Sequence, residues 1–133
     1  YFKTSLKALL IYFVILPFVN LPEFNMPSRI EQLTAYLAAS PNDPFLRYAL
    51  GLEFWKLGDT QTAYQYLSGL TQQYPDYLGT YYQLGKLCEV LQLFDQALTT
   101  YQAGMALART QNDHHTLSEL RTAFNALNDE LFL

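Results

Sequence analysis

The side chains of this 133-residue chain that could most readily bind a metal or act in catalysis are a histidine pair and a single cysteine. His114 and His115 are adjacent, so on a helix their side chains point about 100 degrees apart and cannot bind one metal ion together. Cys88 falls on the inward face of its predicted helix, whereas reactive thiols need exposure and nearby positive charge. Lys86 is close in sequence but turns to another face. We therefore predict no metal site, no cofactor and no catalytic nucleophile.

Sequence motifs of catalysis are also missing. The chain has no Gly-rich phosphate loop, no H-E-x-x-H and no G-x-S-x-G. The single cysteine excludes an internal disulfide and a multi-cysteine metal site. We expect that the protein is not an enzyme.

Composition excludes two further classes of protein. Half of the residues are apolar and only 15% are charged, so the chain does not have the composition of a disordered protein. After residue 25, 6 lysines and arginines stand against 11 aspartates and glutamates. Such an acidic surface repels phosphate backbones, so we expect no nucleic-acid partner.

The segment 1–25 differs from the rest of the chain. An apolar run from Ala8 to Val19 follows two lysines. It is shorter than the roughly 20 apolar residues of a membrane-spanning helix. Three interpretations stay open: an anchor or signal, upstream sequence that is not part of the natural protein because the first methionine is Met26, or a buried helix. We expect a cytoplasmic protein, with a membrane-anchored, periplasmic one as the alternative if residues 6–21 are a real anchor.

From residue 26 to 133, helix-start signals and helix breakers alternate. Ser28 and Glu31 form an S-x-x-E capping box, which predicts a helix over 28–40. Prolines and turn residues at 41–44 end it and start the next helix, which runs to about residue 57. Gly58 makes a turn, and Asp59 or the following threonine caps a third helix.

The end of the chain predicts a closing helix over 114–129. Thr116 and Glu119 offer a second capping box. Apolar residues then recur at spacings of three and four, as on one face of a helix: Leu117, Leu120, Phe124 and Leu127. Such a helix would cover the last apolar face of a stack.

Helix-ending prolines and apolar residues recur every 34 positions. Pro41 and Pro75 are separated by this interval. The same shift aligns Tyr48 with Tyr82, Leu50 and Gly51 with Leu84 and Gly85, Leu57 with Leu91, and Ala63 with Ala97. A period of 34 with two helices per period resembles the tetratricopeptide repeat (TPR) of small bacterial proteins, whose signature is W-x2-L-G-x2-Y, then A-x3-F, then P.

The resemblance covers two complete repeats, 44–77 and 78–111. The first carries the signature as Arg47, Leu50, Gly51, Phe54, Ala63, Leu67 and Pro75, and the second as Tyr81, Leu84, Gly85, Cys88, Ala97 and Tyr101. Helix 28–40 then corresponds to the second half of a repeat whose first half is missing. The chain departs from the family pattern where Arg47 replaces an aromatic residue and Gln92 replaces the turn glycine.

The resemblance implies an all-α fold, a short α-solenoid of antiparallel helical hairpins with flanking capping helices. Gly51 and Gly85 lie in the middle of predicted helices, where glycine costs about 1 kcal/mol relative to alanine. We therefore expect each paired helix to approach closely at its glycine, with Ala63 and Ala97 as the small residues across the pair.

The resemblance also implies a protein-interaction scaffold that binds a peptide or helical segment of a partner in a concave groove. The groove residues expected from helix spacing are Phe45, Tyr48, Leu52, Trp55, Tyr82, Lys86 and Glu89. Aromatic side chains of this kind are enriched at binding hot spots. Alternatively, Phe45, Tyr48 and Trp55 pack against helix 28–40 and complete the core.

Two further possibilities remain open. One is a membrane-anchored envelope assembly factor with an extracytoplasmic repeat domain. The other is a homo-oligomer that forms through an incompletely covered end, because two repeats make a short stack.

Overall fold

The computed structural model describes residues 26–133, and in that range it contains six α-helices and no strand. The helices are α2 (Arg29–Ala39), α3 (Pro44–Lys56), α4 (Thr60–Gln73), α5 (Gly79–Val90), α6 (Phe94–Thr110) and α7 (His114–Phe132). Within the described part, none of these helices combines the length and apolar character that crossing a membrane requires. The predictions made for residues 1–25 lie outside the described residues.

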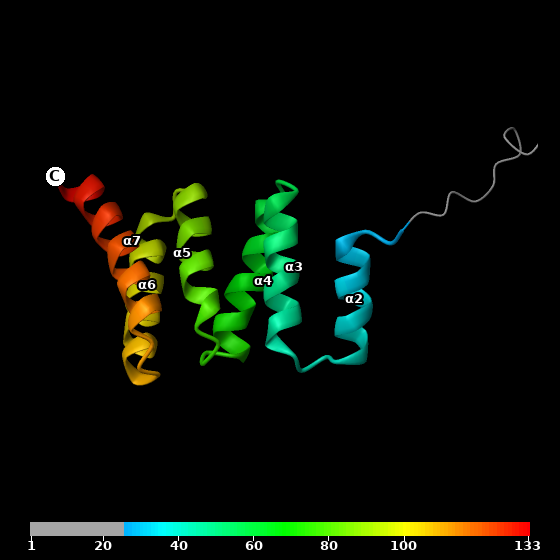
Figure 1. Cartoon of the computed structure of the whole chain (residues 1–133). Coiled ribbons are helices and arrows are strands. Elements are labelled where there is room, and N and C mark those ends of the chain that lie inside the picture. The colour runs from blue at the N-terminus through cyan, green and yellow to red at the C-terminus, as the bar shows by residue number, and fades with distance from the viewer. Residues whose placement is uncertain (1–25) are drawn as a thin grey trace, which may run out of the picture.

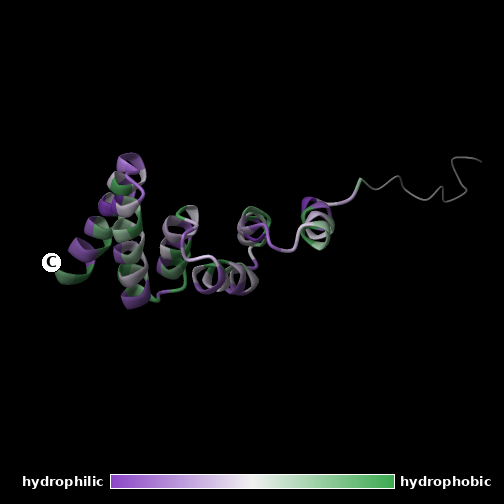
Figure 2. Cartoon of the chain, turned by 90° about the horizontal axis from the view of Figure 1, so that it is seen from below, coloured by the Kyte–Doolittle hydropathy of each residue, from purple (hydrophilic) through white to green (hydrophobic). Residues whose placement is uncertain are grey.

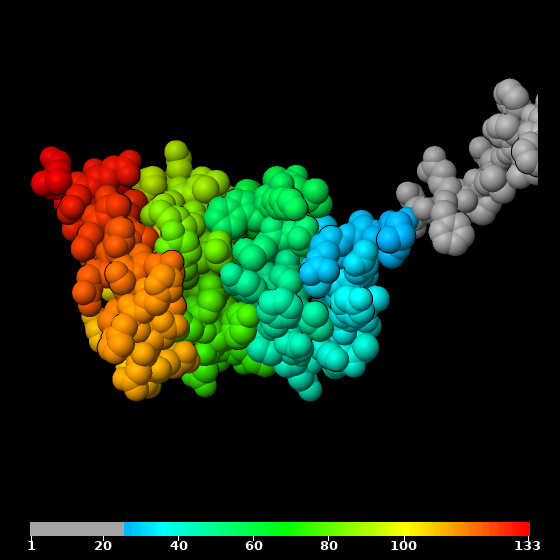
Figure 3. Space-filling model, in the orientation of Figure 1, coloured from blue at the N-terminus to red at the C-terminus, as the bar shows by residue number. Residues whose placement is uncertain are grey.

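The helices follow one another in chain order from α2 at one end of the molecule to α7 at the other (Figures 1 and 3). The closest packing joins α3 with α4, α5 with α6, and α6 with α7, while α2 packs on α3 and α4 packs on α5. Two hairpins, α3–α4 and α5–α6, are thus flanked by one single helix on each side. The predicted all-α stack of hairpins is confirmed.

Side-chain caps set the starts of the first three helices. The Ser28 hydroxyl accepts from the Glu31 amide at 3.2 Å, and the Glu31 carboxylate accepts from the Ser28 amide at 3.0 Å, so the predicted capping box is present. Asp43 caps α3, which has Pro44 as its first residue. Asp59 caps α4 by accepting from the Thr62 amide at 3.0 Å. These caps satisfy amides that have no partner inside the helix.

The prediction of a second capping box at Thr116 is wrong, because Asp113 is the cap of α7. Its carboxylate accepts from the Thr116 amide at 2.9 Å and from the Thr116 hydroxyl at 2.8 Å. The helix therefore begins at His114, before the threonine. It continues to Phe132, beyond the expected end at residue 129.

Three turns use a left-handed backbone conformation. Gly58 between α3 and α4 has φ 86°, and Gln92, its counterpart in the next repeat, has φ 60°. Asn112 before α7 has φ 57°. Asparagine adopts this conformation more readily than most residues, but glutamine does not. The turn after α5 thus has the same left-handed conformation as the turn after α3, although a glutamine stands there in place of the glycine.

Both hairpins are packed around the glycine of their first helix. A Cβ atom added to Gly85 would overlap the ring of Tyr101, and one added to Gly51 would lie 3.0 Å from Cδ2 of Leu67. The expected close approach is confirmed. The atoms nearest to the glycines belong to these large side chains, however, and not to Ala63 and Ala97, which are fully buried one helical turn earlier.

The core has a large and a small part. The large part joins α4, α5, α6 and α7, and α7 contributes Leu120, Ala123 and Leu127 to it. The small part joins α2 to α3 through Leu33, Leu46 and Leu50. Every helix carries both hydrophobic and hydrophilic residues (Figure 2), as expected for helices with one buried side.

Substitution of Gly85 by alanine should destabilise the fold by about 2–3 kcal/mol, because the added methyl group would overlap the buried ring of Tyr101. The matched control is Gly69→Ala in the middle of α4, where an added Cβ meets nothing within 4 Å. That variant should gain up to about 1 kcal/mol from the better helix propensity of alanine. Urea unfolding followed by circular dichroism measures both. Equal effects of the two substitutions would contradict the packing described here.

Candidate functional site

The expected groove residues of α3 lie along one side of the helix. Phe45, Tyr48, Leu52 and Trp55 are spaced by three and four residues, so they share a face. Phe45 is 52% exposed, and the other three are half-buried. Tyr48 and Trp55 pack against the large core, and none of the three aromatic residues joins the core between α2 and α3. Tyr48 and Trp55 thus do contribute to the core, as the alternative expected, but to the part formed by α4 to α7 and not to the part shared with α2.

Tyr48 links the first hairpin to the second. Its ring meets the ring of Tyr77 edge-on, with the centroids 5.6 Å apart and an interplanar angle of 63°. The side chain of Gln83 on α5 lies near its hydroxyl. Burial raises the pKa of Tyr48 above its ordinary value, and the nearby Gln83 side chain partly opposes this. Tyr48 thus contributes to the surface and also holds α3 against the start of the next repeat.

The expected groove residues of α5 interact with one another. The Lys86 ammonium lies 6.0 Å from the ring centroid of Tyr82 and 3.2 Å from the Glu89 carboxylate. The other oxygen of Glu89 accepts from the hydroxyl of Tyr101 at 3.0 Å. Glu89 is therefore occupied by two partners from its own chain, and its contact with the buried Tyr101 is a structural one. Sequence reasoning assigned Tyr101 only a packing role and missed this bond.

A pocket of about 340 Å³ opens between α5 and α7. It is lined by Tyr82, Lys86, His115, Ser118, Glu119, Thr122, Ala123 and Ala126. His115 and Glu119 are 3.3 Å apart on the surface of α7. The sequence predicted a groove from residues of α3 and α5 only, whereas this pocket brings a polar side of α7 next to Tyr82 and Lys86.

The groups considered for catalysis are Cys88, His114 and His115, and the structure describes all three. Cys88 is fully buried, and this burial raises the pKa of its thiol to about 11, so the reactive thiolate is a minor species at neutral pH. His114 and His115 are exposed at the start of α7. Residues 26–133 contain no group of three or more histidine, cysteine, aspartate or glutamate side chains that could hold a metal ion.

Several solved structures are similar to this one. The solution structure of a tetratricopeptide repeat domain protein from Salinibacter ruber is 42% identical with a TM-score of 0.63, and the match covers 65% of this chain and 88% of that one. A protein from Bordetella parapertussis is 25% identical with a TM-score of 0.68, over 79% of this chain and 91% of that one. The TPR2B domain of yeast Sti1, in complex with pHsp70, has a TM-score of 0.70 at 14% identity, and the match covers 76% of this chain and 81% of that one. No family model and no curated protein sequence matches the chain.

The bond between Tyr101 and Glu89 predicts how stability depends on pH. Burial, followed by the hydrogen bond to Glu89, raises the pKa of Tyr101 above its ordinary value of 10.0. Above pH 10 the unfolded chain releases this proton while the folded chain keeps it, so the free energy of unfolding should fall as pH rises. One such proton contributes a slope of about 1.4 kcal/mol per pH unit.

The free energy of unfolding of the variant Tyr101→Phe at pH 7 should be about 1–2 kcal/mol lower than that of wild type, because Glu89 loses a buried hydrogen-bond donor. It should also show a shallower decrease of stability above pH 10. Denaturant unfolding at a series of pH values measures both. At pH 7, the control Tyr36→Phe removes a hydroxyl from a side chain that is 56% exposed and should change stability little. An unchanged alkaline slope in Tyr101→Phe would contradict this prediction.

Proposed function

The chain belongs to the tetratricopeptide-repeat family, and from this premise we propose that it is a protein-interaction scaffold. Its partner would contribute a peptide or helical segment, held on the surface formed by one side of α3, α5 and α7. The TPR2B domain of Sti1, which shares this fold, is described in complex with pHsp70, and this supports a binding role for the fold.

The exposure of Phe45 is the single observation that carries the proposal. This residue is 52% exposed although it stands on the same side of α3 as the half-buried Tyr48. Aromatic side chains provide a large contact area and lose little conformational entropy on binding. A partner residue that covered Phe45 and Tyr48 would therefore bury apolar surface that the folded chain leaves in water.

The two halves of the surface favour different parts of a partner segment. The side of α3 is aromatic and aliphatic, whereas the pocket between α5 and α7 is lined by Lys86, His115, Glu119 and hydroxyl groups. Lys86 already pairs with Glu89, so a partner gains little from a simple charge contact there. We infer a segment with an apolar anchor for Phe45 and Tyr48, followed by polar residues that lie over α5 and α7.

The compartment and the oligomeric state remain predictions. A cytoplasmic location is expected unless residues 6–21 anchor the chain, in which case the same surface would act outside the cytoplasm as part of an envelope assembly factor. For the oligomeric state, the expectation is pairing of two copies through an incompletely covered end of the stack.

Peptides selected from a random display library on the wild-type protein should lose affinity when Phe45 is replaced by alanine. Loss of a central aromatic contact costs about 2 kcal/mol or more, which is roughly thirtyfold in the dissociation constant. The matched control is Tyr36→Ala on α2, an aromatic side chain of similar exposure, 56%, that does not belong to the proposed surface.

Fluorescence anisotropy with labelled peptides measures the affinities, and circular dichroism verifies that both variants are folded. The proposal predicts weaker binding by Phe45→Ala and unchanged binding by Tyr36→Ala. Equal affinities of wild type and Phe45→Ala for every selected peptide would contradict it.

A further inference from the structure

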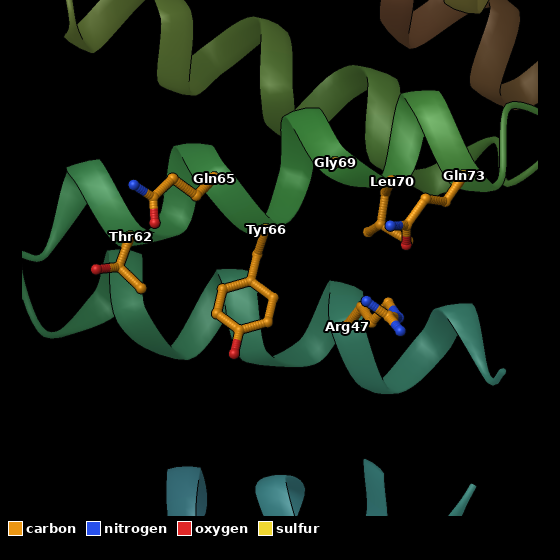
Figure 4. A pocket seen from close by; sticks show the side chains of 7 residues that line it. All are labelled: Arg47, Thr62, Gln65, Tyr66, Gly69, Leu70 and Gln73. Carbon is orange, nitrogen blue, oxygen red and sulfur yellow. The ribbon is translucent and has the colours of Figure 1, made fainter. Parts of the chain in front are cut away.

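A second pocket, of about 390 Å³, opens between α3 and α4. It is lined by Arg47, Thr62, Gln65, Tyr66, Gly69, Leu70 and Gln73. Figure 4 shows Tyr66, Leu70 and Gln73 projecting from α4 toward α3, where the Arg47 guanidinium lies. None of these residues belongs to the surface proposed above, so the pocket needs its own explanation.

Arg47 lines the pocket at the position where the second repeat has a tyrosine. The equivalent residue, Tyr81, is 8% exposed and donates from its hydroxyl to the Pro75 carbonyl at 2.6 Å. Arg47 makes the corresponding bond, from Nη2 to the Pro41 carbonyl at 3.1 Å. The arginine thus keeps the hydrogen bond of the tyrosine and places a guanidinium, in place of a phenol ring, beside an opening on α4.

The guanidinium brings a positive charge that the pocket does not balance. No aspartate or glutamate lines it. The Nε atom of Arg47 is buried and has no hydrogen-bond partner among residues 26–133. Arginine is always charged, and a buried charged donor without a partner is unfavourable. An anion at this position would therefore be stabilised by a charge that the fold leaves uncompensated.

Gly69 leaves the opposite wall of the pocket bare. It lies inside α4, and an added Cβ would meet nothing within 4 Å. The glycines at 51, 85 and 104, by contrast, each closely face a side chain of another helix, which explains them by packing. No contact within the described residues explains Gly69, although glycine in a helix costs about 1 kcal/mol relative to alanine. Its missing side chain lets a ligand approach the backbone of α4.

We propose that this pocket binds an oxyanion, either a carboxylate or a phosphate group. The Arg47 guanidinium is the charged donor, since its planar fork matches the two oxygens of such groups. Gln73 lies at the same end of the pocket as the guanidinium and supplies a neutral hydrogen-bonding group, whereas Thr62 and Gln65 line the other end (Figure 4). The site is separate from the side of α3, α5 and α7, so it stands or falls independently of the proposed partner surface.

The test is a titration of the whole chain with acetate, and separately with inorganic phosphate, at constant ionic strength set by chloride. The Arg47 Nε–Hε resonance and the amides of Gly69 and Gln73 are followed by NMR. Wild type should show saturable shifts at these three groups. The anion that saturates at the lower concentration identifies the source as a carboxylate or a phosphate.

Two variants remove the site in different ways. Arg47→Tyr introduces the residue of the second repeat and removes the charge, and Gly69→Leu fills the pocket while keeping the arginine. In both variants, the apparent affinity obtained from the amide shifts should fall by about tenfold or more. The control Gln72→Leu changes an exposed neighbour on α4 that does not line the pocket, and it should bind as wild type does.

The proposal is overturned if wild-type shifts rise linearly with both anions. It is also overturned if a folded Gly69→Leu protein still shows the saturable shift. This second variant tests the proposal even if Arg47→Tyr does not fold.

Discussion

The contact between a glycine in the first helix of a hairpin and a large side chain in the second is the constraint on which the rest of this structure depends. At Gly85 the ring of Tyr101 occupies the space that any other residue would fill with a Cβ atom. Because the ring packs against Gly85, its hydroxyl reaches Glu89, which lies one turn further along the same side of α5. Glu89 in turn holds Lys86, which lies over Tyr82. A single packing contact thus orders part of the candidate surface.

Much of the fold could be predicted because the regular repeat period and the helix caps are local signals. The residues that contact the glycines could not be predicted, because Ala63 and Leu67 lie one turn apart on the same face of α4. Only the way the two helices approach each other decides which of them meets Gly51. The contribution of α7 was missed for another reason. Helix α6 has 17 residues where α4 has 14, so the register of the first two repeats does not extend to α7.

The candidate surface and the Arg47 pocket show what a repeat can do with substitutions in its signature. On α3, α5 and α7, helix spacing predicted which residues share a face, but not that Glu89 is already bound by Tyr101 and Lys86. At residue 47, the sequence showed a departure from the aromatic pattern but not its consequence. The pocket is lined by side chains of both α3 and α4, and a sequence does not give how far apart these side chains lie.

The most direct test of the account is an NMR measurement of the Gly85 Hα protons in the unmodified protein. The structure predicts nuclear Overhauser effects between these protons and the ring protons of Tyr101, together with a large upfield ring-current shift. Chemical shifts near those of an unstructured glycine, without any such Overhauser effect, would show that α5 and α6 do not meet there, and the hairpin packing described above would be wrong.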